Sequence, residues 1–195
     1  MIHKKPLVSV SVVTYNHKNY IKECLDGILM QQTNFPFEII LGEDESSDGT
    51  REICVEYANK YPDKINLFLR SRKDVIYING NPTGRFNFIE NLKAANGKYI
   101  ALCEGDDYWT DPLKLQKQVD FLEGNPDYVL CFHKVKIKTT KNEIVDDFIT
   151  EERYDRIIDF PITHTALYKY SNFIHTPSVL FKNIIDKIPV ELYFS

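Results

Sequence analysis

Residues 7–16 read LVSVSVVTYN, a valine-rich run that ends in Thr-Tyr-Asn. Apolar side chains at nearly every position are typical of a strand covered on both faces, as in a parallel sheet. The run is much shorter than a membrane span and no small-residue cleavage site follows it, so we interpret it as neither anchor nor signal peptide. Parallel strands need crossover connections. Residues 20–29 carry apolar side chains at the helical period, with Asn19 as the expected N-terminal cap.

The strand-then-helix pattern recurs along the chain. Short apolar runs at residues 37–41, 65–69 and 99–103 are each followed by a polar loop and then by a helical pattern. Asp111 and Pro112 predict the start of the helix after the last of these runs. Such alternation predicts a doubly wound α/β layer structure.

The periodicity weakens in the last third of the chain. We expect a strand at 128–138 that forms a hairpin with 144–148, a helix at 164–172, a strand at 174–181 and a short helix at 182–188. No linker, low-complexity tract or internal repeat interrupts the sequence, so the prediction is one domain over residues 1–195.

Composition limits the classes of protein to which this chain can belong. The hydrophobic share of 43% in 195 residues is enough for one sizeable core. Because 24 Lys and Arg stand against 28 Asp and Glu, the formal charge is −4 and no cationic field would gather nucleic acid. The cysteines lack C-x-x-C spacing and lie in apolar segments, so we expect reduced, buried thiols in a cytoplasmic chain. They are Cys24, Cys54, Cys103 and Cys131.

The sharpest chemical feature is an acidic loop directly after the run at 99–103. Glu104, Asp106 and Asp107 place three carboxylates within four residues, where ligands bind at the carboxyl ends of parallel strands. Such carboxylates repel one another unless a cation neutralises them. Hard oxygen ligands without a Cys/His cluster favour Mg²⁺ or Mn²⁺ over zinc. The alternative is structural, because acidic loops also cap the helices that follow them.

Two more polar loops follow predicted strands. Residues 14–16 end the first strand, and the loop 43–50 ends the second. Asp44 lies at the strand tip and is expected to face a ligand, whereas Asp48 is expected to cap the next helix. Neither a G-x-G-x-x-G motif nor a Walker lysine motif is present, so a bound diphosphate would need a metal bridge.

Three segments in this order resemble family 2 glycosyltransferases, the inverting sugar transferases of the GT-A fold: residues 10–16, 43–50 and 104–107. The resemblance implies a Rossmann-like, mostly parallel sheet flanked by helices. It divides the domain into a nucleotide-sugar-binding half at about 6–125 and a smaller acceptor-side half at about 126–195. It also implies transfer of a sugar from a nucleotide diphosphate donor, usually a UDP-sugar, to a hydroxyl of a saccharide or lipid-linked acceptor.

The resemblance assigns roles by position. The nucleoside pocket falls to Thr14, Tyr15 and Asn16. Asp44 would accept a hydrogen bond from the base, and Asp106 would hold a Mn²⁺ or Mg²⁺ ion that bridges the phosphates. Glu104 and Asp107 would support the metal or the donor sugar, although Glu104 stands where the family usually has aspartate. Many relatives carry an arginine where this chain has residues 87–89, so the resemblance implies that this contact is either lost here or passed to Arg85.

No general base can be assigned from the sequence. In this family the base belongs to an acidic motif that follows a segment similar to residues 173–181, and the chain ends at Ser195. Asp186 and Glu191 lack the expected context, so we expect the base to lie beyond Ser195 and the acceptor half to be truncated. The histidines are expected to be structural or on the acceptor side: His133, His164 and His175.

Three functions follow from these observations. The first is a metal-dependent inverting glycosyltransferase of surface polysaccharide or glycolipid synthesis, cytoplasmic and without a transmembrane segment, acting at the inner face of the membrane. The second is a nucleotide-sugar-binding fragment that lacks the base and turnover. The third, a nucleotidyltransferase, is disfavoured because residues 14–18 contain no glycine and one lysine.

Overall fold

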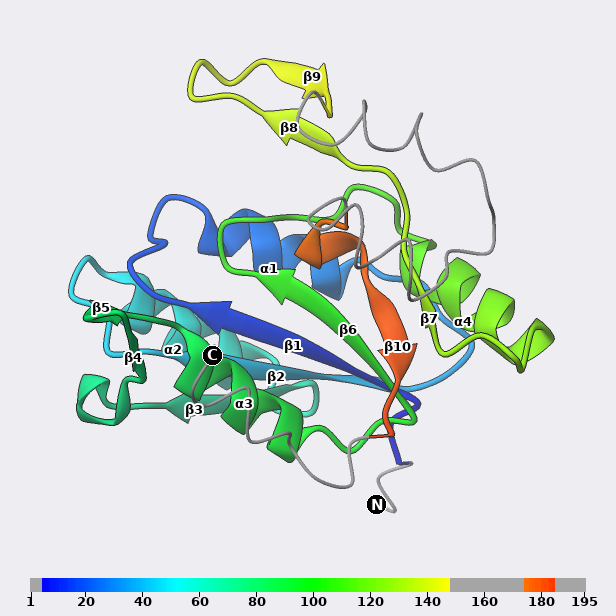
Figure 1. Ribbon diagram of the computed structural model, residues 1–195, viewed down its shortest axis with the longest axis horizontal. Helices are drawn as coiled ribbons and strands as arrows, with labels where there is room; N and C mark the ends of the chain where they lie inside the picture. Colours follow the sequence, from blue (N-terminus) through cyan, green and yellow to red (C-terminus); the bar gives the residue numbers. More distant parts are fainter. Residues whose placement is uncertain (1–4, 148–173, 185–195) are drawn as a thin grey trace.

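The computed structural model describes residues 5–147 and 174–184. In these residues a six-stranded sheet carries helices on both faces (Figure 1). The strands are β1 (Val8–Thr14), β2 (Phe37–Glu43), β3 (Ile65–Leu69), β4 (Tyr77–Ile78), β5 (Asn81–Pro82), β6 (Tyr99–Glu104), β7 (Leu130–Cys131), β8 (Lys136–Lys138), β9 (Ile144–Asp146) and β10 (Leu180–Lys182). The helices are α1 (Ile21–Leu29), α2 (Thr50–Lys60), α3 (Arg85–Ala94) and α4 (Lys114–Gly124), with short 3₁₀ turns η1 (Arg72–Asp74) and η2 (Thr176–Ser178).

Strand β1 lies inside the sheet and pairs in parallel with both β2 and β6. The order is β3-β2-β1-β6-β10-β7, with β10 antiparallel to β6 and β7 antiparallel to β10. The mostly parallel α/β sheet predicted from the sequence is therefore confirmed. Because the chain moves from β1 toward β3 and then returns to the other side of β1, the strand order reverses between β1 and β6. That reversal is where open α/β sheets form their ligand crevice.

The alternation of valine and serine in β1 reflects two different faces. Val8, Val10 and Val12 belong to the main core, to which α1, α2 and α4 contribute their apolar sides. Ser9 and Ser11 face the other side, where Ser11 Oγ accepts a hydrogen bond from α3. All five side chains are buried, as expected for a strand covered on both faces.

A buried polar network fastens α3 to the sheet. Asn91 is fully buried, and its Nδ2 donates to the carbonyls of Val12 in β1 and Ile40 in β2 at 2.9 and 3.0 Å. Its Oδ1 accepts from Arg70 Nη1 at 2.7 Å. Gly42 lies against this network, and a Cβ there would come within 2.2 Å of the Arg70 guanidinium. The network thus joins both central strands to the segment that follows β3.

The C-terminal elements extend the sheet and cover one end of it. Strand β10 pairs with β6 at residues 180–182 and carries η2 toward the end of β6. Strands β8 and β9 form a separate hairpin, as predicted, with Asn142 at its tip in a positive-φ conformation. The predicted strand at 128–138 is instead interrupted between β7 and β8. Of the other two predicted helices, 164–172 lies outside the described residues, and so does most of 182–188.

Two predicted helix starts are wrong in detail. Helix α1 has Tyr20 at its N-cap with no side-chain cap bond, so Asn19 does not cap it. Helix α4 begins at Lys114, after the position that Asp111 and Pro112 predicted. Asp111 accepts from the Leu113 amide at 2.9 Å and so closes the turn before the helix. Asp48 does serve the second helix, because its Oδ1 accepts from the Thr50 amide at 3.0 Å.

All four cysteines are free thiols, as predicted. Cys24 of α1 and Cys103 of β6 are buried with their sulfurs 3.7 Å apart. Burial and this contact raise the pKa of the Cys24 thiol well above its ordinary value, which keeps it protonated and unreactive. Within the described part of the chain, no helix has the length and apolarity that a membrane crossing requires.

The α3 network generates a stability prediction. Asn91→Leu removes the donor to two strand carbonyls and one acceptor of the Arg70 guanidinium, so we expect a loss of about 2–4 kcal/mol in the free energy of unfolding. Urea titration followed by circular dichroism measures it. Asn59→Leu, at an exposed position of α2, is the matched control and should stay within about 0.5 kcal/mol of the wild type. A loss below about 1 kcal/mol for Asn91→Leu would contradict the role of the network.

Candidate functional site

The site loops lie side by side at the carboxyl ends of β1, β2 and β6. Backbone hydrogen bonds tie them together: the Asp44 amide donates to Thr14 O at 3.1 Å, and the Gly105 amide donates to Val13 O at 2.9 Å. Gly105 allows the closest approach, because a Cβ there would come within 2.5 Å of Thr14 Oγ1. The polar loops that the sequence singled out therefore form one continuous edge.

The acidic loop brings its three carboxylates together. Glu104, Asp106 and Asp107 each offer an oxygen, and these oxygens lie within 4.8 Å of one another. Among residues 5–147 and 174–184, the carboxylates of Glu104 and Asp107 accept no hydrogen bond and form no ion pair. Asp106 has a histidine near it, with His17 Nε2 at 3.9 Å. The helix-capping alternative is therefore not what this cluster does.

Electrostatics in the cluster favour a bound cation. Burial, followed by the charges of Asp106 and Glu104, raises the pKa of Asp107 to about 6. Burial and the charge of Asp106 also raise the pKa of Glu104. Carboxylates that resist ionisation in this way are stabilised in their charged form by a divalent ion bound among them. The residues present thus fit Mg²⁺ or Mn²⁺, for which carboxylate oxygens are the preferred ligands.

A second group of side chains lies at the end of β2. Asp44 is 2% exposed, and its Oδ2 accepts from Arg72 Nη1 at 2.7 Å. Its Oδ1 is buried and has no partner among the described residues. Burial raises the pKa of Asp44, although Arg72 opposes that shift. The Arg72 guanidinium also lies 4.1 Å from the ring centroid of Tyr15. An aromatic ring, a guanidinium and a free carboxylate oxygen are therefore grouped at this edge.

The other predicted site residues lie in different settings. Thr14 is buried, and its Oγ1 has no partner in the described structure. Asn16 has φ 55° and accepts from the Ser47 amide at 3.0 Å, so it holds the β1 and β2 loops together. Arg85 is the first residue of α3, and its contact with a donor stays a prediction.

Arg72 is a site residue that the sequence analysis missed. It lies in η1, after the third strand, in the segment SRKD that carries no recognised motif. Only the folded chain brings its guanidinium to Asp44, 28 positions earlier. One feature of the sequence could have indicated it: Arg72 is a basic residue shortly after the third strand, and the carboxyl end of that strand lies at the same edge of the sheet as the site loops.

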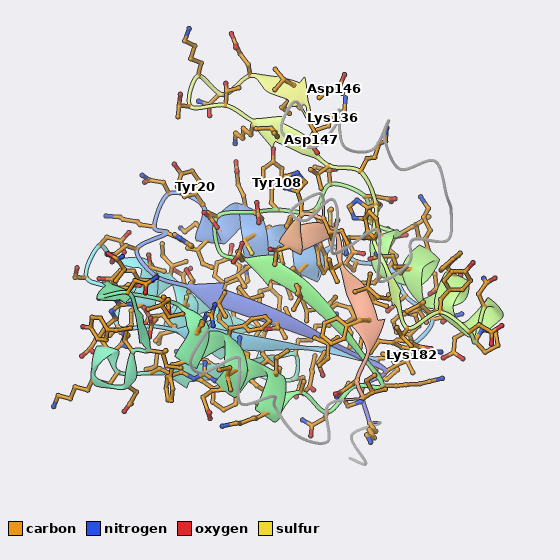
Figure 2. All side chains as sticks on the ribbon, in the orientation of Figure 1. Tyr20, Tyr108, Lys136, Asp146, Asp147 and Lys182 are labelled. Carbon is orange, nitrogen blue, oxygen red and sulfur yellow. The ribbon has the colours of Figure 1, made fainter. Side chains whose placement is uncertain are left out.

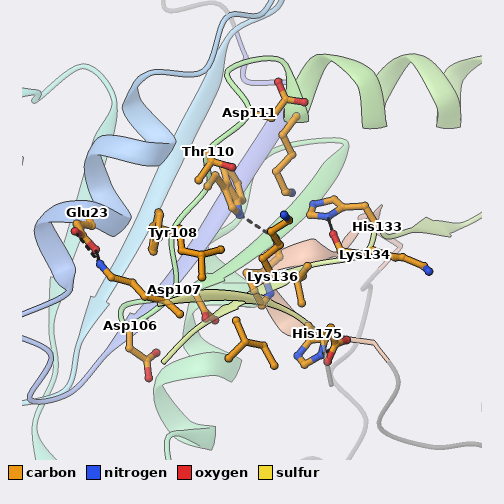
Figure 3. A pocket seen from close by; sticks show the side chains of 18 of the residues that line it. Glu23, Asp106, Asp107, Tyr108, Thr110, Asp111, His133, Lys134, Lys136 and His175 are labelled. Carbon is orange, nitrogen blue, oxygen red and sulfur yellow. Dashed lines mark hydrogen bonds and ion pairs between the residues drawn. The ribbon is translucent and has the colours of Figure 1, made fainter. Parts of the chain in front are cut away.

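A large cavity lies between the acidic loop and the β8–β9 hairpin. Its volume is about 1320 Å³, and its lining includes Asp106, Asp107, Trp109 and His175. Figure 3 shows Asp106 and Asp107 on one wall, and His133 and Lys134 on the other. The β8–β9 hairpin closes one side, where Figure 2 shows Lys136 and Asp146 above Tyr20 and Tyr108.

One histidine of the cavity has a carboxylate partner. His175 Nε2 lies 3.0 Å from Oδ2 of Asp147, which is 7% exposed. The His175 imidazole also lowers the pKa of Asp107 slightly against the effect of burial. His133 and His175 therefore both line this cavity, and their role as structural or acceptor-side histidines stays a prediction. His164 lies outside the described residues.

The fold and this edge together define a GT-A glycosyltransferase domain. The solved mannosyltransferase PcManGT from Pyrobaculum calidifontis, in complex with GDP-Man and Mn²⁺, superposes with a TM-score of 0.60 at 21% identity, over 92% of this chain and 45% of that one. S. aureus TarS 1–349 in complex with UDP gives a TM-score of 0.56 at 23% identity, over 90% of this chain and 46% of that one. These likenesses concern the fold.

The chain belongs to glycosyl transferase family 2, whose model matches residues 9–188. An uncharacterized protein of Mycobacterium tuberculosis is 38% identical over 187 residues, which are 95% of this chain and 50% of the relative. An uncharacterized glycosyltransferase of Methanocaldococcus jannaschii is 34% identical over 76% of this chain and 48% of its own length. The chain thus spans about half the length of these relatives.

The raised pKa of Asp107 predicts a pH-dependent stability in metal-free protein. Between its ordinary pKa of 3.8 and about 6, folded Asp107 holds a proton that the unfolded chain has lost. The free energy of unfolding therefore falls as pH rises through this window. In EDTA, we expect Asp107→Asn to be more stable than the wild type by about 1 kcal/mol at pH 7.5, after allowance for solvent screening, with the difference disappearing near pH 4.

Thermal unfolding across pH 4–8 measures this difference. Asp127→Asn, on an exposed loop, is the control and should follow the wild-type curve. Equal stability of Asp107→Asn and wild type at every pH would mean that the carboxylates do not repel one another in the folded protein.

Proposed function

We propose that this chain is the donor-binding part of a metal-dependent inverting glycosyltransferase that uses a nucleotide diphosphate sugar. The observation that carries the proposal is the acidic cluster at the end of β6, whose three carboxylates offer oxygens within 4.8 Å of one another. Among the described residues, their one basic neighbour within ion-pair distance is the histidine beside Asp106. A nucleotide diphosphate bound at this edge needs a cation, because no glycine-rich phosphate loop is present.

In this proposal, different parts of the edge bind different parts of the donor, and the acidic loop binds the diphosphate through a metal ion. In this proposal Asp106 holds Mn²⁺ or Mg²⁺, with Glu104 and Asp107 completing the acidic set. A cation held by these residues would stabilise the negative charge that accumulates on the departing nucleotide diphosphate, and would do so more in the transition state than in the bound donor.

The group at the end of β2 suits a nucleoside. Tyr15 presents an exposed aromatic ring, and the partnerless Oδ1 of Asp44 can accept a hydrogen bond from an N–H of the base. Arg72 orients the Asp44 carboxylate through its 2.7 Å bond and opposes the rise in its pKa that burial causes. We expect uracil at this position. Guanine also offers a ring N–H, so a comparison of UDP with GDP tests the choice.

The acceptor would enter the cavity next to the acidic loop. The attacking hydroxyl must lose a proton to a base, and we propose no described residue for that role. Complete transfer of the sugar is part of this proposal. We further propose a saccharide or lipid-linked acceptor of surface polysaccharide or glycolipid synthesis, handled at the cytoplasmic face of the membrane. A nucleotide-sugar-binding function without turnover is the alternative for this chain alone.

Calorimetric titration of UDP with and without Mn²⁺ tests the proposal. We expect binding that depends on Mn²⁺, and Asp106→Asn should weaken it by at least about tenfold because one charged ligand is lost. The thermal stability of the metal-free variant should be unchanged or slightly higher, since the substitution removes repulsion.

The control is Asp63→Asn, at an exposed position far along the chain from the acidic loop, which should bind UDP as the wild type does. Absence of UDP and GDP binding in Mn²⁺ would refute the proposed function. Asp106→Asn with normal affinity and a large loss of stability would assign the cluster a structural role instead.

A further inference from the structure

Lys114 is a buried cation on the wall of the cavity next to the acidic loop. It is the first residue of α4 and is 5% exposed, yet its side chain lines the cavity. Its Nζ donates to Gln118 Oε1 at 2.7 Å and lies 4.0 Å from the ring centroid of Trp109. Burial lowers the pKa of Lys114 to about 8, so the ammonium form still predominates at pH 7. Both contacts are made with uncharged groups.

The local fold does not account for this lysine. A cation in the first turn of a helix is opposed by the helix dipole. The amides of that turn are already bonded, with Leu113 N on Asp111 Oδ1 and Leu115 N on Gln31 Oε1. Burying an ammonium without a counter-charge costs free energy that an apolar side chain of similar length would not. The helix dipole, the hydrogen bonds of the first turn and the burial of the position therefore do not favour a lysine at residue 114.

The other lysines of the cavity show what is unusual about Lys114. Three of them pair with carboxylates of the described chain: Lys117 with Asp111, Lys136 with Asp146, and Lys138 with Glu23. Within residues 5–147 and 174–184, the Lys114 ammonium has no carboxylate within ion-pair distance. Lys114 is also the buried lysine of this group, and burial is where an unpaired cation costs the most free energy.

A second basic group lies near Lys114. His133 lines the same cavity, and the Lys114 ammonium adds to the effect of burial in lowering its pKa. His133 Nδ1 lies 2.8 Å from the Lys134 carbonyl, which can only accept, so Nδ1 is the donor. Nε2 then accepts in the neutral ring and donates to an anion only when the imidazole is protonated. Figure 3 shows His133 across the cavity from Asp106 and Asp107. We call Asp106 and Asp107 the acidic wall of the cavity, and Lys114 and His133 its basic wall. Asp111 lies near His133 and is paired with Lys117.

We propose that Lys114 recognises an anionic group of the acceptor, a phosphate or a carboxylate, and that His133 adds a second donor when its imidazole is protonated. The acidic wall is taken by the cation and the donor diphosphate in the proposed function, on which this inference rests. An anion at the basic wall supplies the counter-charge that Lys114 lacks. It also fixes which hydroxyl of the acceptor points toward the acidic wall, so Lys114 determines specificity without taking part in the chemistry.

Trp109 provides the measurement, because it is the one tryptophan of the chain and its ring contacts the Lys114 ammonium. The emission of the full chain is recorded at constant ionic strength during titration with inorganic phosphate, glucuronate, or the uncharged methyl ester of glucuronate. We expect a saturable change with phosphate, glucuronate or both, and at least tenfold weaker binding of the ester than of glucuronate where glucuronate binds. Phosphate and glucuronate together distinguish the two sources of the anion.

Two variants assign the effect to one side chain. Lys114→Met keeps the length and apolar contacts of the side chain, and should weaken anion binding at least tenfold. Lys117→Met, one turn further along α4 and exposed, is the matched control and should bind as the wild type does. A melting curve for each variant shows that it is folded.

Three results would overturn the inference: no response to either anion, equal binding of glucuronate and its ester without phosphate binding, or unchanged anion affinity in folded Lys114→Met. If Lys114→Met does not fold, the ligand comparison on the wild type decides. UDP titration with Mn²⁺ separates the two proposals. Donor binding without anion binding refutes the role of Lys114 alone, whereas anion binding without donor binding refutes the proposed function.

Discussion

The pairing of β1 with both β2 and β6 is the constraint on which the rest of this structure depends. Its parallel register brings three loops to one edge, and backbone hydrogen bonds from Asp44 to Thr14 and from Gly105 to Val13 hold them there. The positions of the loops that carry the candidate donor-binding side chains are therefore fixed by backbone hydrogen bonds. The buried Asn91 network supports the same strands from the α3 side.

The parts of the fold that follow from local pattern were predictable. Apolar runs and helical periods located the parallel strands and their helices, and the acidic loop at residues 104–107 was visible because three carboxylates follow a buried strand. Helix starts were less predictable. Asp111 has the right chemistry for a cap, but it closes a turn ahead of α4, and packing against Gln31 decides where the helix begins.

The parts of the site that depend on long-range contacts could not be derived from the sequence. Arg72 reaches Asp44 and Tyr15 only after β3 is placed beside β2. His175 reaches Asp147, and η2 reaches the end of β6, because β10 inserts antiparallel into the sheet from the far end of the chain. Lys114 has the same origin, since its burial depends on Trp109 and on Gln118, which donates to Ser178 O. Hydrophobic periodicity does not predict such long-range contacts.

The close contact at Gly105 has a further consequence for the substrates this edge can accept. Because main-chain bonds fix the spacing between the end of β2 and the acidic loop, that spacing cannot adjust to its occupant as side-chain arms could. The distance between the end of β2 and the acidic loop is therefore set by the main chain. In the proposed function, this fixed spacing favours a donor whose base and phosphates together match the distance between the two groups.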